Sequence, residues 1–208
     1  MTDKSRIVNV LTLARVPLVV AWMVFALLEE RYGGFALGFA ACASMLLSGL
    51  TDLWDGSLAR RWGVVSTFGK LADPLMDKIF YVVAFPTLIW LVASRDGVAS
   101  AHSLSMLAFT ILYILRDLWV TFMRAVGSVY GAPVAAMMLG KVRTALSFPA
   151  AGWIYLYVLL SPVMPCRAAH ALLWSCYAVE ALMTALNVYS FWSYTRAYMP
   201  YVKKALEK

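Results

Sequence analysis

Four acidic residues stand in a fixed frame in the first half of the sequence: Asp52, Asp55, Asp73 and Asp77. The first pair is spaced i, i+3 and the second i, i+4, so on a helix the two carboxylates of each pair lie on one face. Carboxylates that converge on a small volume repel one another unless cations compensate them. Hard divalent cations such as Mg²⁺ or Mn²⁺ prefer oxygen ligands of this kind. The pattern therefore predicts a metal site.

The stretch between the two aspartate pairs is short and contains the turn signal Trp62-Gly63. Two helices joined by so short a turn run antiparallel. We therefore expect Asp52 to face Asp77, and Asp55 to face Asp73 about one helical turn closer to the connecting turn. This arrangement would gather all four carboxylates in one place.

The rest of the 208-residue chain is strongly apolar, with 62% hydrophobic and only 14% charged residues. A soluble domain has about one quarter charged residues, so the composition favours a single membrane domain over residues 1–208. A membrane-spanning helix needs about 20 mainly apolar residues. We predict an all-α, polytopic integral membrane protein with six transmembrane helices, at residues 13–29, 34–61, 67–93, 102–127, 140–161 and 168–195.

The basic residues predict an orientation. With six spans, most of the 18 Lys and Arg residues lie on the same side as both termini. The positive-inside rule then places the termini and the aspartates on the cytoplasmic side. The net charge of +7 suits anionic lipid headgroups. No basic stripe with interleaved aromatic residues is present, so we expect membrane lipids as partners and no nucleic acid.

Small and basic residues accompany the aspartates. Gly56, Ala59 and Gly69 are small enough to let a helix or a flat ligand approach the backbone closely. Arg60 and Lys70 flank the acidic cluster and could hold phosphate oxygens. These five positions predict a phosphate-bearing ligand beside the metal site.

Residues 52–77 read D-x2-D-G-x2-A-R-x8-G-x3-D-x3-D, which resembles the signature of the CDP-alcohol phosphatidyltransferase family without a departure. The resemblance implies a six-helix membrane bundle whose polar cavity faces the cytoplasm, in a bacterial inner membrane. It also implies a metal-assisted transfer from a CDP-linked lipid with release of CMP, and a homodimer. The aspartates would hold one or two divalent ions, Asp77 would also be the general base, and Gly56, Ala59 and Arg60 would line the CDP pocket.

The start of the chain carries a second resemblance. Asn9, Thr12 and Arg15 match the Asn-x-x-Thr-x-x-Arg opening of bacterial phosphatidylglycerophosphate synthases, a branch of that family. On this resemblance we assign these three residues to the site of CDP-diacylglycerol.

A set of cations on the cytoplasmic side suits an acceptor that carries its own phosphate, such as glycerol-3-phosphate. The set consists of Arg116, Arg124, Lys141 and Arg143. Surrounding segments are similar to the same branch, but Asp117 stands where that branch has Glu, and no Gln follows Thr144. A cardiolipin synthase of the family, with phosphatidylglycerol as acceptor, and members that use inositol phosphate or serine therefore remain alternatives.

Two other classes of protein fit less well. A transporter or channel would spread its acidic residues across the bilayer rather than cluster them at one end, and a silent scaffold would not need all four aspartates. Of the remaining titratable residues, His102 and His170 are predicted to have no special role. Glu180 lies in the middle of the last span, and we expect it to pair with a basic residue.

Overall fold

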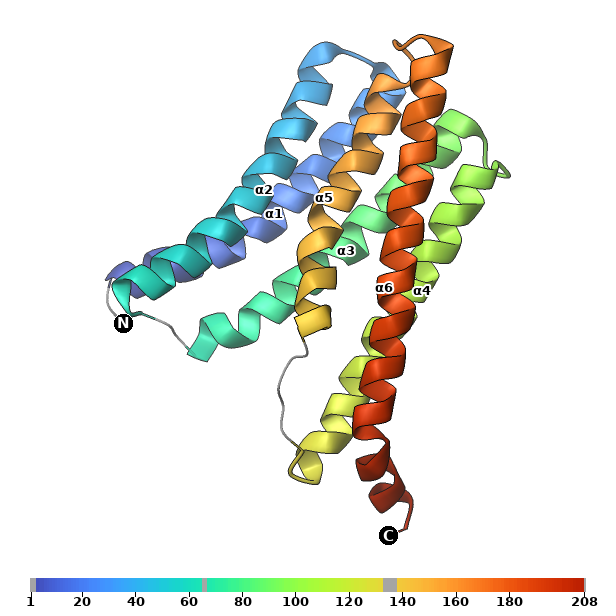
Figure 1. Cartoon of the computed structure of the whole chain (residues 1–208). Helices are drawn as coiled ribbons and strands as arrows, with labels where there is room; N and C mark the ends of the chain where they lie inside the picture. The colour runs from blue at the N-terminus through green and yellow to red at the C-terminus, as the bar shows by residue number, and fades with distance from the viewer. Residues whose placement is uncertain (1–2, 65–66, 133–137, 208) are drawn as a thin grey trace. The chain divides into compact units, whose positions relative to one another are not determined.

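The computed structural model describes residues 3–64, 67–132 and 138–207, without the side chains of residues 67, 70, 71, 138, 139 and 141. Over these residues the chain is helical and has no strand, which confirms the predicted all-α class (Figure 1). The helices are α1 Asp3–Tyr32, α2 Phe35–Trp62, α3 Thr67–Asp96, α4 Ala101–Val129, α5 Met138–Leu160 and α6 Cys166–Leu206.

Five of the described helices are long and apolar enough to cross a membrane, namely α1, α2, α3 from Ala72, α4 and α6. A polytopic membrane protein is therefore confirmed. The sixth predicted span, 140–161, coincides with α5 but is not among these five. That helix is shorter and carries Arg143 and Pro149 among its apolar residues.

The predicted boundaries are wrong at two helix ends. The first helix begins at Asp3, ten residues before the predicted start, and α6 continues to Leu206, eleven residues past the predicted end. Both extensions contain charged residues and therefore do not belong to the apolar segments of the sequence. A helix does not have to end where its apolar stretch ends, because its backbone hydrogen bonds are internal and do not depend on the surrounding solvent.

The chain divides into two compact units, residues 1–95 and 96–208. In the first unit α1 and α2 pack side by side (Figure 1). They are antiparallel, because Thr12 near the start of α1 contacts Asp55 near the end of α2. Helix α3 runs in the same direction as α1. Arg15 of α1 contacts Asp77 of α3, and Glu30, later in α1, contacts Arg95, later in α3.

The turn between α2 and α3 depends on a glycine. Gly63 adopts a left-handed conformation with φ 64° and caps the end of α2, and its N–H donates to Arg60 O. Residues with a side chain are disfavoured in this conformation. The turn ends α2 soon after Asp55 and starts α3 shortly before Asp73 and Asp77, as the sequence predicted.

In the second unit α6 packs against both α4 and α5 (Figure 1). Helices α4 and α6 run in the same direction, since His102 and Trp119 of α4 contact Glu180 and Thr195 of α6 in that order. Helix α5 runs opposite to α6. Gly127 of α4 lies directly against Tyr198 of α6, since an added Cβ atom would lie 2.5 Å from the Tyr198 ring.

Candidate active site

The aspartates of the first unit meet around one guanidinium group. The buried Arg15 side chain places Nη2 3.2 Å from Asp55 Oδ2 and also against Asp52 Oδ1. Its Nη1 lies 3.2 Å from Asp77 Oδ1. Arg15 therefore joins carboxylates from the end of α2 and the start of α3, and three of the four predicted aspartates come together.

Thr12 lies one turn before Arg15 on the same face of α1. Its hydroxyl Oγ1 lies 2.9 Å from Asp55 Oδ2, to which it donates. Asn9 continues this face by another turn and is buried. The predicted set of Asn9, Thr12 and Arg15 therefore lines one side of α1, and its last two members contact the aspartates directly.

The three carboxylates differ in their access to solvent. Asp55 is 4% exposed as a residue, whereas the side chains of Asp52 and Asp77 are 52% and 38% exposed. Asp73 lies one turn before Asp77 on α3 and is also exposed. Asp55 is therefore the buried carboxylate of the site, and Asp52, Asp73 and Asp77 are the carboxylates that solvent can reach.

Over residues 3–64, 67–132 and 138–207, no group of three or more His, Cys, Asp or Glu side chains is placed to hold a metal ion. The donor set nevertheless suits one. Three carboxylates, all hard oxygen donors, surround a single positive charge supplied by Arg15. Mg²⁺ and Mn²⁺ bind to donors of this kind. The residues present therefore fit a divalent cation that would take over the role of Arg15 in compensating the carboxylates.

The other predicted ligand residues lie on α2 and α3 near the aspartates. Arg60 folds over Gly56, where an added Cβ atom would lie 3.6 Å from Arg60 Nη1. Arg60 is exposed, and Ala59 and Gly69 are half-buried. Lys70 belongs to α3, but its side chain is outside the described part. A role for these residues toward CDP stays a prediction.

Two of the four predicted acceptor cations meet in the second unit. Arg143 of α5 is buried, donates through Nη2 to Asp117 Oδ1 at 3.1 Å, and lies 4.0 Å from the centre of the Tyr113 ring. Arg116 of α4 pairs with the same Asp117 oxygen at 3.7 Å. Asp117, which stands where the related branch has Glu, thus joins Arg116 and Arg143.

Two further partners come from α6 and were missed. Asn187 Oδ1 accepts from Arg143 Nη1 at 3.1 Å, and Ser190 Oγ accepts from Arg116. Both residues are buried in a helix that is long and apolar enough to cross a membrane. Polar residues spaced i, i+3 in a membrane span were the signal that could have identified them. Arg124 is half-buried farther along α4, and the Lys141 side chain is outside the described part.

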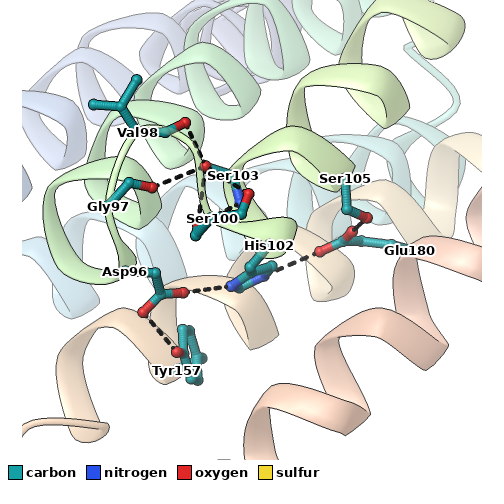
Figure 2. A network of polar contacts seen from close by, with 9 residues as sticks. All are labelled: Asp96, Gly97, Val98, Ser100, His102, Ser103, Ser105, Tyr157 and Glu180. Atoms are coloured by element: carbon teal, nitrogen blue, oxygen red, sulfur yellow. Dashed lines mark hydrogen bonds and ion pairs between the residues drawn. The ribbon is translucent and has the colours of Figure 1, made fainter.

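A second polar network gives His102 partners that the sequence did not indicate (Figure 2). His102 is buried, with Nδ1 2.9 Å from Asp96 Oδ2 and Nε2 3.1 Å from Glu180 Oε1. Tyr157 donates to the other Asp96 oxygen at 2.8 Å, and Ser105 donates to the other Glu180 oxygen. The prediction that Glu180 pairs with a basic residue is confirmed, and His102 is that residue.

Known proteins are similar to this chain over most of its length. The family model described as CDP-alcohol phosphatidyltransferase matches residues 6–191, which include parts of both units. A Bacillus subtilis protein named CDP-diacylglycerol–glycerol-3-phosphate 3-phosphatidyltransferase is 28% identical over 89% of this chain and 92% of its own length. A Mycoplasma genitalium protein of the same name is 30% identical over 68% of this chain and 61% of its own length.

A Streptomyces coelicolor protein named cardiolipin synthase (CMP-forming) is also similar. It is 36% identical, but over only 39% of this chain and 38% of its own length. Similarity that covers most of the chain is thus found with proteins named for a glycerol-3-phosphate acceptor.

Proposed function

Because the chain belongs to the CDP-alcohol phosphatidyltransferase family, we propose that it transfers the phosphatidyl group of CDP-diacylglycerol to glycerol-3-phosphate. The products are phosphatidylglycerophosphate and CMP, so the enzyme serves phospholipid biosynthesis. The observation that carries the proposal is the meeting of Asp52, Asp55 and Asp77 around Arg15 in a membrane enzyme of this family. The relatives that match most of the chain support the choice of acceptor.

The four aspartates, including Asp73, are proposed to hold one or two Mg²⁺ or Mn²⁺ ions. When bound, such an ion neutralises the charge of the CDP pyrophosphate and stabilises the leaving CMP. Asp55, buried and fixed by Thr12 and Arg15, is suited to anchoring the site rather than to exchanging protons. Its rigid position would set the geometry for the more exposed carboxylates.

Asp77 is proposed as the general base. A base must reach the acceptor hydroxyl, and the Asp77 side chain is accessible while its Oδ1 is held by Arg15. Asp77 would take the proton of that hydroxyl, and the resulting oxygen would attack the phosphorus that bears the lipid. The bond from this phosphorus to the CMP oxygen would break, and CMP would leave.

The remaining predicted residues divide between the two substrates. The CDP-lipid would contact the α1 face and the small and basic residues of α2 and α3: Asn9, Thr12, Arg15, Gly56, Ala59, Arg60, Gly69 and Lys70. The acceptor phosphate would contact the cations of α4 and α5: Arg116, Arg124, Lys141 and Arg143. An acceptor without a phosphate, such as serine, would not supply the phosphate oxygens that these cations are suited to bind.

We further propose that residues 1–208 act as one membrane domain in a bacterial inner membrane, as a homodimer, with both termini and the active site on the cytoplasmic side. Within the first unit, basic residues accompany the aspartates. Lys4 Nζ lies 5.9 Å from the centre of the Trp62 ring, which places the start of α1 beside the end of α2. The excess of positive charge at this end agrees with a cytoplasmic location.

The test is CMP release by the purified full-length protein in mixed micelles with CDP-diacylglycerol and Mg²⁺ or Mn²⁺. Glycerol-3-phosphate, phosphatidylglycerol, inositol-1-phosphate and serine are supplied separately. We expect metal-dependent release with glycerol-3-phosphate. Release with phosphatidylglycerol alone would instead assign the protein to the cardiolipin synthases. Asp55→Asn should abolish release, and Asp3→Asn, an exposed aspartate at the start of α1, is the matched control.

A further inference from the structure

Several buried N–H groups of the second unit have no acceptor in the described part of the chain, and among them are Arg116 Nε, Arg143 Nε and Asn187 Nδ2. These three groups belong to one cluster. Arg143 donates to Asn187 and to Asp117, and Asp117 also pairs with Arg116. Buried donors without an acceptor lower stability, and folded proteins seldom leave several together. The cluster is therefore suited to receive oxygen atoms from a ligand.

The orientation of the Asn187 amide follows from its partner. A guanidinium group has only donors, so the Asn187 atom that contacts Arg143 Nη1 must be the carbonyl oxygen. The amide NH₂ group is consequently directed away from that contact with hydrogens to donate. Asn187 is 1% exposed, so bulk water does not reach it.

The charges of the cluster do not balance. Arg116 and Arg143 share the single carboxylate of Asp117, which leaves one surplus positive charge among the described side chains. Both guanidinium groups are buried and packed against tyrosine rings, Tyr194 and Tyr113. A surplus charge inside a membrane protein is costly unless an anion accompanies it.

We propose that Asn187 is a substrate-binding residue that, with Arg116 and Arg143, donates to the phosphate oxygens of the acceptor. The inference rests on the proposed function and adds an α6 side chain to the acceptor site. A phosphate monoester offers only acceptor atoms at physiological pH and brings the negative charge that the cluster lacks. A neutral alcohol would leave the donors unpaired, so Asn187 makes the site selective for phosphorylated acceptors.

The variant Asn187→Asp tests the proposed phosphate contact, because it should weaken phosphate binding without lowering the stability of the fold. The carboxylate keeps an oxygen for Arg143 and cancels the surplus charge, but it removes the donor and repels a phosphate. Without ligand, the variant should unfold at the same temperature as the wild type or at a higher one. Inorganic phosphate and glycerol-3-phosphate should raise the unfolding temperature of the wild type and leave that of the variant unchanged.

Kinetics supply the second measurement. Asn187→Asp should raise the KM for glycerol-3-phosphate by about tenfold or more, and change the KM for CDP-diacylglycerol by less than about twofold. Thr184→Val, on the same helix about one turn away, is the matched control and should behave as the wild type.

Three results would overturn the inference. They are a wild type that phosphate does not stabilise, an Asn187→Asp enzyme with an unchanged KM for the acceptor, and an Asn187→Asp protein less stable than the wild type without ligand. The proposed function fails differently, through wild-type CMP release with phosphatidylglycerol but not with glycerol-3-phosphate. In that case the inference would still be supported if phosphate stabilised the wild type but not Asn187→Asp. The ligand of Asn187 would then be the phosphodiester of the acceptor lipid.

Discussion

Replacement of His102 by leucine should destabilise the protein strongly. His102 lies between two carboxylates, Asp96 and Glu180, and both ring nitrogens contact their oxygens (Figure 2). Leucine fills a similar volume but donates no hydrogen bond. The Asp96 side chain is 17% exposed and has Tyr157 as a second donor, so it can recover a partner from water. Glu180 is 3% exposed and retains only the Ser105 contact among those described.

The magnitude follows from the burial of this pair. Removal of one partner of a buried ion pair costs about 3–5 kcal/mol. For a chain of this size, 1 kcal/mol corresponds to about 2–4 °C of unfolding temperature, so His102→Leu should lower it by about 6–20 °C. The measurement is the fraction of protein that stays monodisperse in detergent after heating. His170→Leu, an exposed histidine of α6, is the control and should shift the midpoint by about 2 °C or less.

A double variant tests the reason for the loss. If the cost comes from the unpaired Glu180 carboxylate, His102→Leu combined with Glu180→Leu should regain most of the lost stability, because an apolar pair can replace a buried ion pair without large cost. A double variant that is less stable than His102→Leu would refute this reasoning. So would a single variant as stable as the His170 control.

Three further predictions concern other contacts. Asp77→Asn should keep metal-dependent binding of CDP-diacylglycerol but lose turnover, and more than a few per cent of residual CMP release would remove Asp77 from the base role. Arg15→Met should bind Mn²⁺ more tightly in the absence of substrate, as followed by electron paramagnetic resonance, since a competing cation is removed from three carboxylates; weaker binding would show that Arg15 instead orders the ligands. Gly127→Ala should cost about 1–3 kcal/mol of unfolding free energy, because its methyl group would collide with the Tyr198 ring; unchanged thermal stability would contradict so close a packing of α4 and α6.

Local spacing allowed much of this protein to be predicted. Long apolar stretches require helices in a membrane, because only internal hydrogen bonds satisfy the backbone there. Gly63 predicted the turn between α2 and α3, and the positions of the aspartates relative to that turn followed from the helical repeat. The family signature lies wholly within this short range, so the class of enzyme could also be recognised from the sequence.

Contacts between distant helices could not be predicted in the same way. Arg15 was assigned to the CDP-lipid, and only the packing of α1 against α2 and α3 shows that it holds the aspartates together. His102 and Glu180 are 78 residues apart in the sequence. No spacing rule relates residues on different helices, so the sequence does not predict that these two side chains pair. The sequence did not predict a binding role for Asn187, and only its position on α6 beside Arg143 suggests one. Spacing along one helix is set by its backbone geometry, whereas the pairing of side chains on different helices depends on how those helices rotate and pack, which only the tertiary structure decides.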